Sequence, residues 1–171
     1  MNHKNTKGFT LIELLIYIAL VTGILIAATS FAWNIINSRT KAFAIQEVEQ
    51  NGRFIMEKII QASYSATDIT SPTRGNSASQ LELVQKDLTY NPTIFTLVNG
   101  AVQMRQGAGE LINVSSDRIR ATDLSFKNMS SANDKTKNVE VTLTLEHLNP
   151  DNRQEWEFSD DFTVTIELRD K

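Results

Sequence analysis

Residues 14–33 are twenty consecutive positions without a charged side chain. As an α-helix they would span about 30 Å, the thickness of the hydrocarbon core of a bilayer. The run is too long for a secretory signal peptide, whose apolar segment has about 7–15 residues. A plain membrane anchor has the right length, but it leaves unexplained Glu13, the acidic residue directly before the run.

The helical pattern continues beyond the apolar run, since the first Pro of the chain is Pro72. Small and apolar residues recur at spacings of three and four, as one face of a helix requires. These residues are Ala44, Val48, Gly52, Ile55, Ile59, Ala62 and Ala66. We expect one helix from about residue 9 to about residue 66. Its first part, residues 9–36, is apolar all round, and residues 37–66 form an amphipathic continuation that packs on a soluble domain.

Further along, the period of the pattern changes from helix to strand. Residues 67–79 are rich in Ser, Thr, Asn, Pro and Gly and are expected to form a loop. Asn99-Gly100 separates two apolar runs and is a strong hairpin signal. The expected strands cover residues 80–84, 93–98, 101–105, 124–126, 139–145 and 162–168, and the fifth should bury Val139, Val141, Leu143 and Leu145. A helix followed by an antiparallel β-rich domain over residues 67–171 is the α+β class.

Composition narrows the classes of function. The net charge is −3, and without Lys4 and Lys7 in the first eight residues the chain has fifteen basic against twenty acidic side chains. A domain of this charge is a poor candidate for binding nucleic acid through bulk electrostatics. Cys is absent, which excludes a disulfide framework and a thiolate metal site. With only His3 and His147, neither a zinc cluster nor a His-based catalytic centre is expected.

Acidic residues near the carboxy terminus are the remaining candidates for a metal site, because carboxylates suit calcium. Nothing in this group resembles an EF-hand loop, and adjacent acids at a strand start are expected to form a solvated turn. The group comprises Asp151, Glu157, Asp160 and Asp161. Glu110 and Asp117 have no spacing that supports a general acid–base pair. The sequence therefore predicts no catalytic residue, no metal and no cofactor.

Three other features have plain structural interpretations. His147 beside the Asn149-Pro150 turn is expected to be an exposed residue at a strand end. Lys135 and Lys137 fall in a polar segment that is expected to be a solvated loop. Trp156 and Phe158 alternate with acidic residues, so we expect them to share one face of a sheet and to pack in the core.

Residues 7–13, KGFTLIE, lie between a short basic leader and the apolar run. This segment resembles the signature of type IV prepilins and pseudopilins, in which Gly precedes the cleavage point and an aromatic residue, Thr, two aliphatics and Glu follow it. The resemblance implies that a membrane prepilin peptidase cuts between Gly8 and Phe9 and methylates the new amine of Phe9. It further implies that residues 1–8 are lost and that the apolar helix is kept.

Glu13 then has two interpretations. After cleavage it would lie one turn inside the new terminus, on the face that carries Phe9, where the helix dipole favours an acid by a few tenths to about 1 kcal/mol. The resemblance implies a second role, in which Glu13 neutralises the Phe9 amine of a neighbouring subunit during polymerisation. An unpaired carboxylate in an apolar medium is costly, so this pairing would select the correct axial register.

The rest of the chain resembles the minor, J-type pseudopilin or PilW-like branch of the family. The segments that carry this resemblance are residues 51–54, 104–105, 116–119, 124–126 and 166–169. Two features depart from the pattern of major pilins: there is no Cys pair near the carboxy terminus and no Pro in the membrane helix. The resemblance therefore does not extend to the partly melted helix of some major-pilin filaments, which a Pro would favour.

As the resemblance implies, the fold would be the pilin-like ladle and the function structural, with no enzymatic activity. The chain would be a minor subunit of a type IV pilus-like filament or a type II secretion pseudopilus, serving competence, motility, adhesion or secretion. Its implied partners are other pilin or pseudopilin subunits, the prepilin peptidase, the membrane assembly platform and, before assembly, membrane lipid. It would cross the inner membrane once, with the leader in the cytoplasm, and later reach a filament in the periplasm or at the cell surface.

Two alternatives belong to other classes of protein. A signal-anchored extracytoplasmic binding module would keep Met1 and would not polymerise. A secreted enzyme would instead be released as a soluble product that starts near Ser30, where small residues could form a cleavage site. The amino terminus of the mature protein distinguishes all three.

Overall fold

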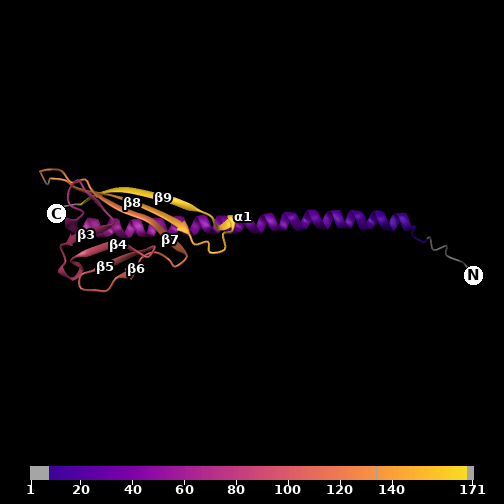
Figure 1. The fold of residues 1–171 in the computed structure, drawn as a ribbon, viewed down its shortest axis with the longest axis horizontal. Helices are drawn as coiled ribbons and strands as arrows, with labels where there is room; N and C mark the ends of the chain where they lie inside the picture. The colour runs from indigo at the N-terminus through magenta and orange to yellow at the C-terminus, as the bar shows by residue number, and fades with distance from the viewer. Residues whose placement is uncertain (1–7, 134, 169–171) are drawn as a thin grey trace, which may run out of the picture. The chain divides into compact units, whose positions relative to one another are not determined.

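The computed structural model describes residues 8–133 and 135–168 (Figure 1). The chain separates into two compact units, Met1–Thr40 and Lys41–Lys171, which are described in turn. A single helix, α1 (Leu11–Ser65), contributes its first part to one unit and its remainder to the other. Both ends of α1 lie within about two residues of the bounds expected from the sequence, the usual uncertainty of helix ends.

The helical part of the first unit has an apolar surface. Every residue from 14 to 36 is exposed, including the large aromatic side chains Phe31 and Trp33. Within the described residues, α1 is long and apolar enough to cross a membrane by length and composition. A helix that is apolar all round requires lipid or other helices as its surroundings.

The second unit is built on the carboxy-terminal part of α1. The buried residues of this part recur at spacings of three and four and are Ala44, Val48, Gly52, Ile55, Met56, Ile59, Ala62 and Ser63. The apolar stripe predicted from the sequence is confirmed. One member differs, because Ala66 is buried as expected but is the first residue of a strand instead of the last of the helix.

The strands form two antiparallel sheets beside this part of α1 (Figure 1). One sheet has the strand order β1-β3-β4-β5-β6, and the other has the order β2-β7-β8-β9. The strands are β1 (Ala66–Ser71), β2 (Ser77–Ala78), β3 (Gln80–Gln85), β4 (Thr93–Val98), β5 (Ala101–Gln106), β6 (Ile112–Asn113), β7 (Ile119–Asn128), β8 (Lys137–His147) and β9 (Ser159–Leu168). Two short 3-10 helices, η1 (Leu88–Tyr90) and η2 (Gln154–Trp156), lie in the connections. The predicted α+β class is confirmed.

One hydrophobic core joins α1 to both sheets. Its largest fully buried side chains include Phe95 from β4 and Phe126 from β7. The alternation predicted for β8 is confirmed, since Val139, Val141, Leu143 and Leu145 are all fully buried. The predicted hairpin is also confirmed, because Asn99 and Gly100 both have positive φ and connect β4 to β5.

The strand expected at residues 124–126 is confirmed and is longer than expected, because it forms the middle of the ten-residue strand β7. Two expectations about local structure are wrong. Residues 67–79 are not one loop, because they contain most of β1 and all of β2. Trp156 and Phe158 do not share a sheet face, because Trp156 lies in η2 and Phe158 lies just before β9. In each case pairing with a distant strand or packing against a distant residue overrides the local pattern.

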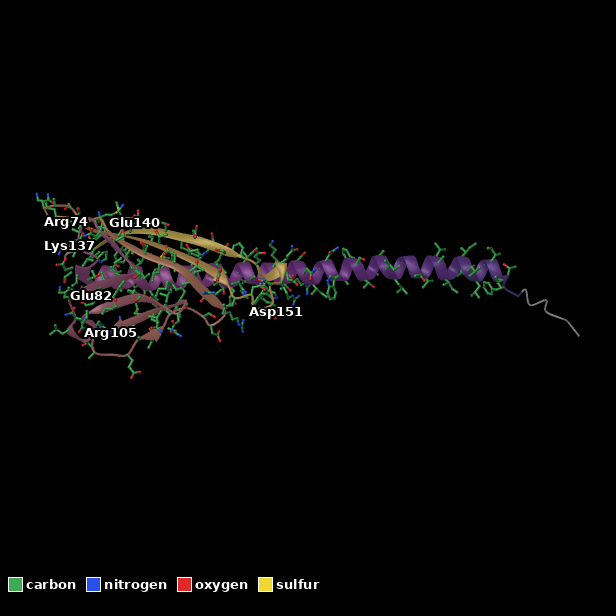
Figure 2. The ribbon with its side chains drawn as sticks, in the orientation of Figure 1. Arg74, Glu82, Arg105, Lys137, Glu140 and Asp151 are labelled. Carbon is green, nitrogen blue, oxygen red and sulfur yellow. The ribbon has the colours of Figure 1, made fainter. Side chains whose placement is uncertain are left out.

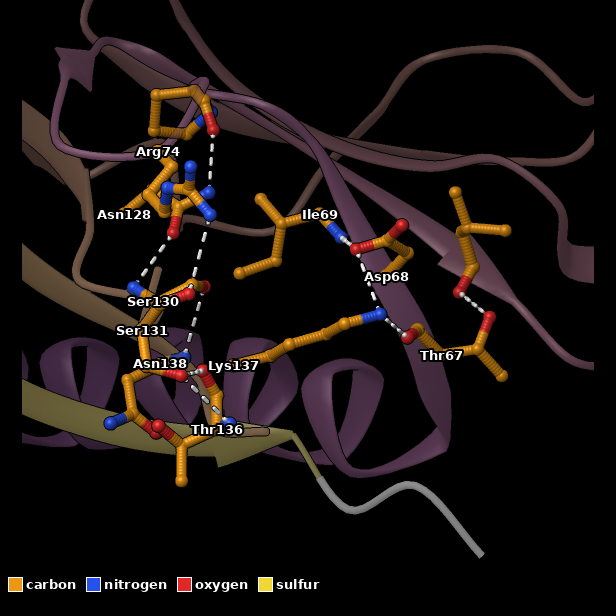
Figure 3. A network of polar contacts seen from close by, with 12 residues as sticks. Thr67, Asp68, Ile69, Arg74, Asn128, Ser130, Ser131, Thr136, Lys137 and Asn138 are labelled. Carbon is orange, nitrogen blue, oxygen red and sulfur yellow. Dashed lines mark hydrogen bonds and ion pairs between the residues drawn. The ribbon is translucent and has the colours of Figure 1, made fainter. Parts of the chain in front are cut away.

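Lys137 links the two sheets (Figure 3). From the start of β8, its ammonium donates to the backbone oxygen of Thr67 in β1 at 2.9 Å and lies 3.1 Å from a carboxylate oxygen of Asp68. Lys137 is therefore a partly buried connector, and its expected place in a solvated loop is wrong. Partial burial raises the pKa of Asp68, but the Ile69 amide and Lys137 outweigh it and hold that pKa below its ordinary value.

An Asp68→Asn variant is expected to lose stability at neutral pH and to lose little at low pH. Because folding lowers the pKa of Asp68, its contribution is present above the unfolded-state pKa of about 3.9 and disappears as the pH falls through the folded-state value. The carboxylate is more than half exposed, so the effect at neutral pH should be below about 1 kcal/mol.

Urea unfolding of the full chain in detergent at pH 7 and at pH 3 measures this difference. If Asp68→Asn were equally destabilising at both pH values, the ionised Asp68–Lys137 contact would not be the cause.

Candidate processing and assembly site

Gly8 and Phe9 lie in non-helical chain directly ahead of α1. Both are exposed, and a Cβ placed on Gly8 would meet no atom within 4 Å. A peptidase must bind its substrate in an extended form, and here the Gly8–Phe9 bond is presented without unfolding a helical turn. Lys4 and Lys7, the basic residues expected before the cleavage point, lie outside the described residues.

Thr10 caps the amino terminus of α1. Its hydroxyl accepts a hydrogen bond from the Glu13 amide at 3.3 Å, and its backbone oxygen accepts one from the Leu14 amide at 3.2 Å. These contacts satisfy donors that a helix start otherwise leaves unpaired. This role of Thr10 was not identified from the sequence, although Thr followed three residues later by Glu is the capping-box spacing that could have revealed it.

Glu13 is held in a small polar and aromatic cluster one turn into the helix. Tyr17, one turn further along, donates a hydrogen bond from its hydroxyl to one Glu13 carboxylate oxygen at 3.3 Å. The Tyr17 ring also contacts the Phe9 ring edge to face, with centroids 5.9 Å apart. A carboxylate can accept several hydrogen bonds, so the Tyr17 contact leaves capacity for an amine or another donor. The arrangement thus gathers Phe9, Glu13 and Tyr17 on one side of the helix start.

Two of the segments that carry the subfamily resemblance contact each other in the second unit. The Asn51 side-chain oxygen in α1 accepts a hydrogen bond from the Ser116 amide at 3.0 Å. Next to it, Arg118 pairs with Glu47 at 3.8 Å and its guanidinium lies over the Phe43 ring. These contacts fasten the connection before β7 to the helix, so the role they support is structural.

His147 is buried, and its expected exposure is wrong. The ring stacks on Trp156 with centroids 4.8 Å apart, and Trp156 meets Phe43 of α1 edge to face. Nδ1 of His147 lies 2.9 Å from the Leu148 backbone oxygen, so it carries the hydrogen of that bond. Aromatic packing from a distant helix covers this strand end, which the local sequence could not indicate.

The acidic residues considered for calcium are spread over different contacts. Asp161 accepts a hydrogen bond from the Thr144 hydroxyl at 2.7 Å, and Asp160 accepts one from the Asp161 amide. Asp151 lies in the connection between β8 and β9 (Figure 2). Among residues 8–133 and 135–168, no group of three or more His, Asp or Glu side chains could hold a metal ion. In the same ranges, no hydrogen bond joins Glu110 to Asp117.

Comparison with known proteins gives one match. A family model described as the prokaryotic N-terminal methylation motif matches residues 3–29, a segment that contains Gly8, Phe9, Thr10, Glu13 and Tyr17. No curated protein and no solved structure matches the chain. The chain therefore carries a prokaryotic N-terminal methylation motif, and this motif together with the exposed apolar helix supports a membrane-anchored, type IV pilin-like precursor.

Proposed function

We propose that this protein is a structural, minor subunit of a type IV pilus-like filament or of a type II secretion pseudopilus. The observation that carries the proposal is the methylation motif at the start of an apolar helix whose residues 14–36 are all exposed. A polymer of such subunits would cover this surface with the corresponding helices of neighbours. Because lipid tails and helix side chains are both apolar, packing and polar pairing decide which helices associate.

Cleavage of the precursor would create the positive group that pairs with Glu13. Cleavage after Gly8 removes Lys4 and Lys7, whose positive charge would otherwise hold the amino terminus on the cytoplasmic side. It also creates an α-amine on Phe9, with an ordinary pKa near 8, that remains largely protonated at neutral pH even after methylation. Glu13 is the acidic group nearest to this amine in sequence, and the Glu13 of one subunit would pair with the Phe9 amine of the next.

The partners follow from this sequence of events. A prepilin peptidase cleaves and methylates the chain, lipid holds the helix until assembly, and a membrane platform driven by a cytoplasmic ATPase transfers it to the growing filament. The carboxy-terminal domain would remain outside the cytoplasmic membrane throughout. The protein itself performs no reaction in this scheme and acts as a substrate and then as a building block.

Intact mass of the protein extracted from membranes tests the proposal directly. We expect the wild-type chain to begin at N-methylated Phe9. Gly8→Leu should be recovered as uncleaved precursor, because the side chain at this position must fit the peptidase groove. Gly23→Leu is the matched control, since Gly23 also has open space around its Cα, and it should be processed normally. A wild-type protein that retains Met1 would contradict the proposal and favour a simple anchor.

A further inference from the structure

Among the strands of the described residues, β9 is the outer strand of its sheet and pairs only with β8. It has ten residues, contains no Pro, and pairs with β8 without a bulge over its whole length. Proteins normally shorten, bend or cover such an edge, because its unpaired backbone groups offer a template for another strand. The long and regular edge of β9 is therefore a candidate site for pairing with another strand.

The hydrogen bonds of β8 identify which β9 backbone groups face outward. The Asn138 backbone oxygen accepts a hydrogen bond from the Met129 amide. The backbone amide and carbonyl groups of Asn138, and of every second residue after it in β8, therefore point toward β7. The backbone groups of the intervening residues of β8 point toward β9, and the hydrogen bond from the His147 amide to the Phe158 backbone oxygen agrees with this. Their partners in β9 are Asp160, Phe162, Val164, Ile166 and Leu168. The amide and carbonyl groups of Thr163, Thr165 and Glu167 consequently point away from the sheet.

One outward amide near the start of β9 is already engaged. The carboxylate of Asp160 accepts a hydrogen bond from the Asp161 amide at 2.9 Å, which occupies one of the outward donors. Within residues 8–133 and 135–168, no hydrogen bond engages the outward amides of Thr163, Thr165 and Glu167. The open stretch is thus long enough for a partner strand to form several main-chain hydrogen bonds.

A groove runs along this open stretch, between β9 and the flank of α1. Its volume is about 280 Å³, and Ile60 and Tyr64 of α1 line it together with Val164, Thr165, Ile166 and Glu167 of β9. A strand added to β9 would direct every second side chain toward the helix, where Ile60 offers an apolar contact. The alternate side chains of the added strand would lie on the solvent-exposed face of the sheet. The exposed side chains of β9 on this face are Asp161, Thr163, Thr165 and Glu167.

We infer that the open edge of β9 binds an extended segment of a different protein by strand addition. Main-chain hydrogen bonds to Thr163, Thr165 and Glu167 supply the affinity, and alternate side chains supply the specificity. The matching segment carries β-branched residues that face Ile60 and basic residues that lie beside Asp161 and Glu167. Opposite charges on neighbouring strands stabilise the pair, and like charges destabilise it.

A second copy of this chain fits the edge less well. Two copies that pair through the same edge would be related by a two-fold axis and would run antiparallel. One antiparallel register would place the Asp161 carboxylate of each copy opposite the Glu167 carboxylate of the other. Like charges on neighbouring strands destabilise the pair, so a segment with basic residues fits this edge better than a second β9 does.

Binding of a synthetic peptide with alternating Lys and Val tests the inference. The full chain is placed in phosphatidylcholine nanodiscs, and empty nanodiscs measure any binding of the peptide to lipid. We expect saturable binding that slows amide exchange at Thr163, Thr165 and Glu167. A peptide with alternating Glu and Val should bind at least about tenfold more weakly, because its charges repel Asp161 and Glu167.

Two further comparisons isolate the main-chain contact. Thr165→Pro removes an outward amide that β8 does not use, and it should weaken binding at least about tenfold, whereas Thr165→Val should change it less than about twofold. A peptide N-methylated at alternate amides should lose binding to the wild-type chain, a comparison that needs no variant to fold. Absence of saturable binding, or equal binding of the N-methylated peptide, would overturn the inference. Intact mass of the same preparation reports processing at Phe9 separately.

Discussion

Glu13→Val is expected to be cleaved and methylated normally and to be nearly absent from assembled filaments. The residues beside the Gly8–Phe9 bond are unchanged, so the peptidase should still act. In a filament, however, the variant would leave the Phe9 amine of a neighbouring subunit without its counter-charge in apolar surroundings. Loss of one member of a buried ion pair costs about 3–5 kcal/mol, which corresponds to more than a hundredfold loss of incorporation.

The measurement is the ratio of this protein in sheared filaments to that in membranes, with the complete set of subunits expressed. Two controls separate charge from shape. Glu13→Gln keeps the size and hydrogen bonding but not the charge, and it should fail as Glu13→Val does. Tyr17→Phe removes only the hydroxyl that donates to Glu13, and it should assemble within about twofold of wild type. Efficient incorporation of Glu13→Val would rule out the pairing role.

The elements predicted correctly are those that a local sequence pattern specifies, through either burial or backbone conformation. Strand β8 alternates so regularly that a shift by one residue would expose four apolar side chains and bury polar ones. The stripe on α1 is equally constrained by its period. The Asn99-Gly100 turn is set by its two residues, since few other side chains accept positive φ at both positions.

The errors fall where distant parts of the chain decide the structure. β1 begins where α1 ends, and its Ser- and Thr-rich sequence gains strand structure by pairing with β3. His147 and Trp156 are covered because Phe43 of α1 lies against them. A local sequence pattern cannot indicate a contact between residues about a hundred positions apart, such as Phe43 and Trp156. The same holds for Lys137, whose partner Asp68 lies in the other sheet.

More of the candidate site than of the fold could be predicted from the sequence, because its residues are close together in the chain. Gly8, Phe9 and Glu13 lie within six residues, and the resemblance of this segment to the prepilin signature is what proposes their roles. The cap formed by Thr10 was not identified, although its capping-box spacing to Glu13 is a sequence signal for it. The hydrogen bond from Tyr17 to the Glu13 carboxylate was also not identified. The open edge of β9 was also beyond prediction, since an edge strand and a central strand can have the same alternating pattern.

Gly52→Ala is expected to destabilise the second unit by about 1–3 kcal/mol, although Ala is the better helix former. A Cβ at this position would lie less than 3.0 Å from three ring atoms of Phe162 in β9, so the ring must move for the side chain to fit. The helix would gain about 1 kcal/mol from the substitution in the absence of this contact. Overpacking of the helix against the sheet should therefore outweigh the gain in helix propensity.

A double-mutant cycle with Phe162→Ala determines which effect dominates. Phe162→Ala alone should be destabilising because it removes the ring that covers Gly52. In the Phe162→Ala background, Gly52→Ala should become neutral or stabilising by up to about 1 kcal/mol. Urea unfolding of the full chain in detergent, followed by circular dichroism, gives all four free energies. If Gly52→Ala cost the same with and without the Phe162 ring, close packing of β9 on the helix would not be the reason for glycine at position 52. A reversal of sign would show that glycine is required there by the approach of the sheet, against the preference of the helix itself.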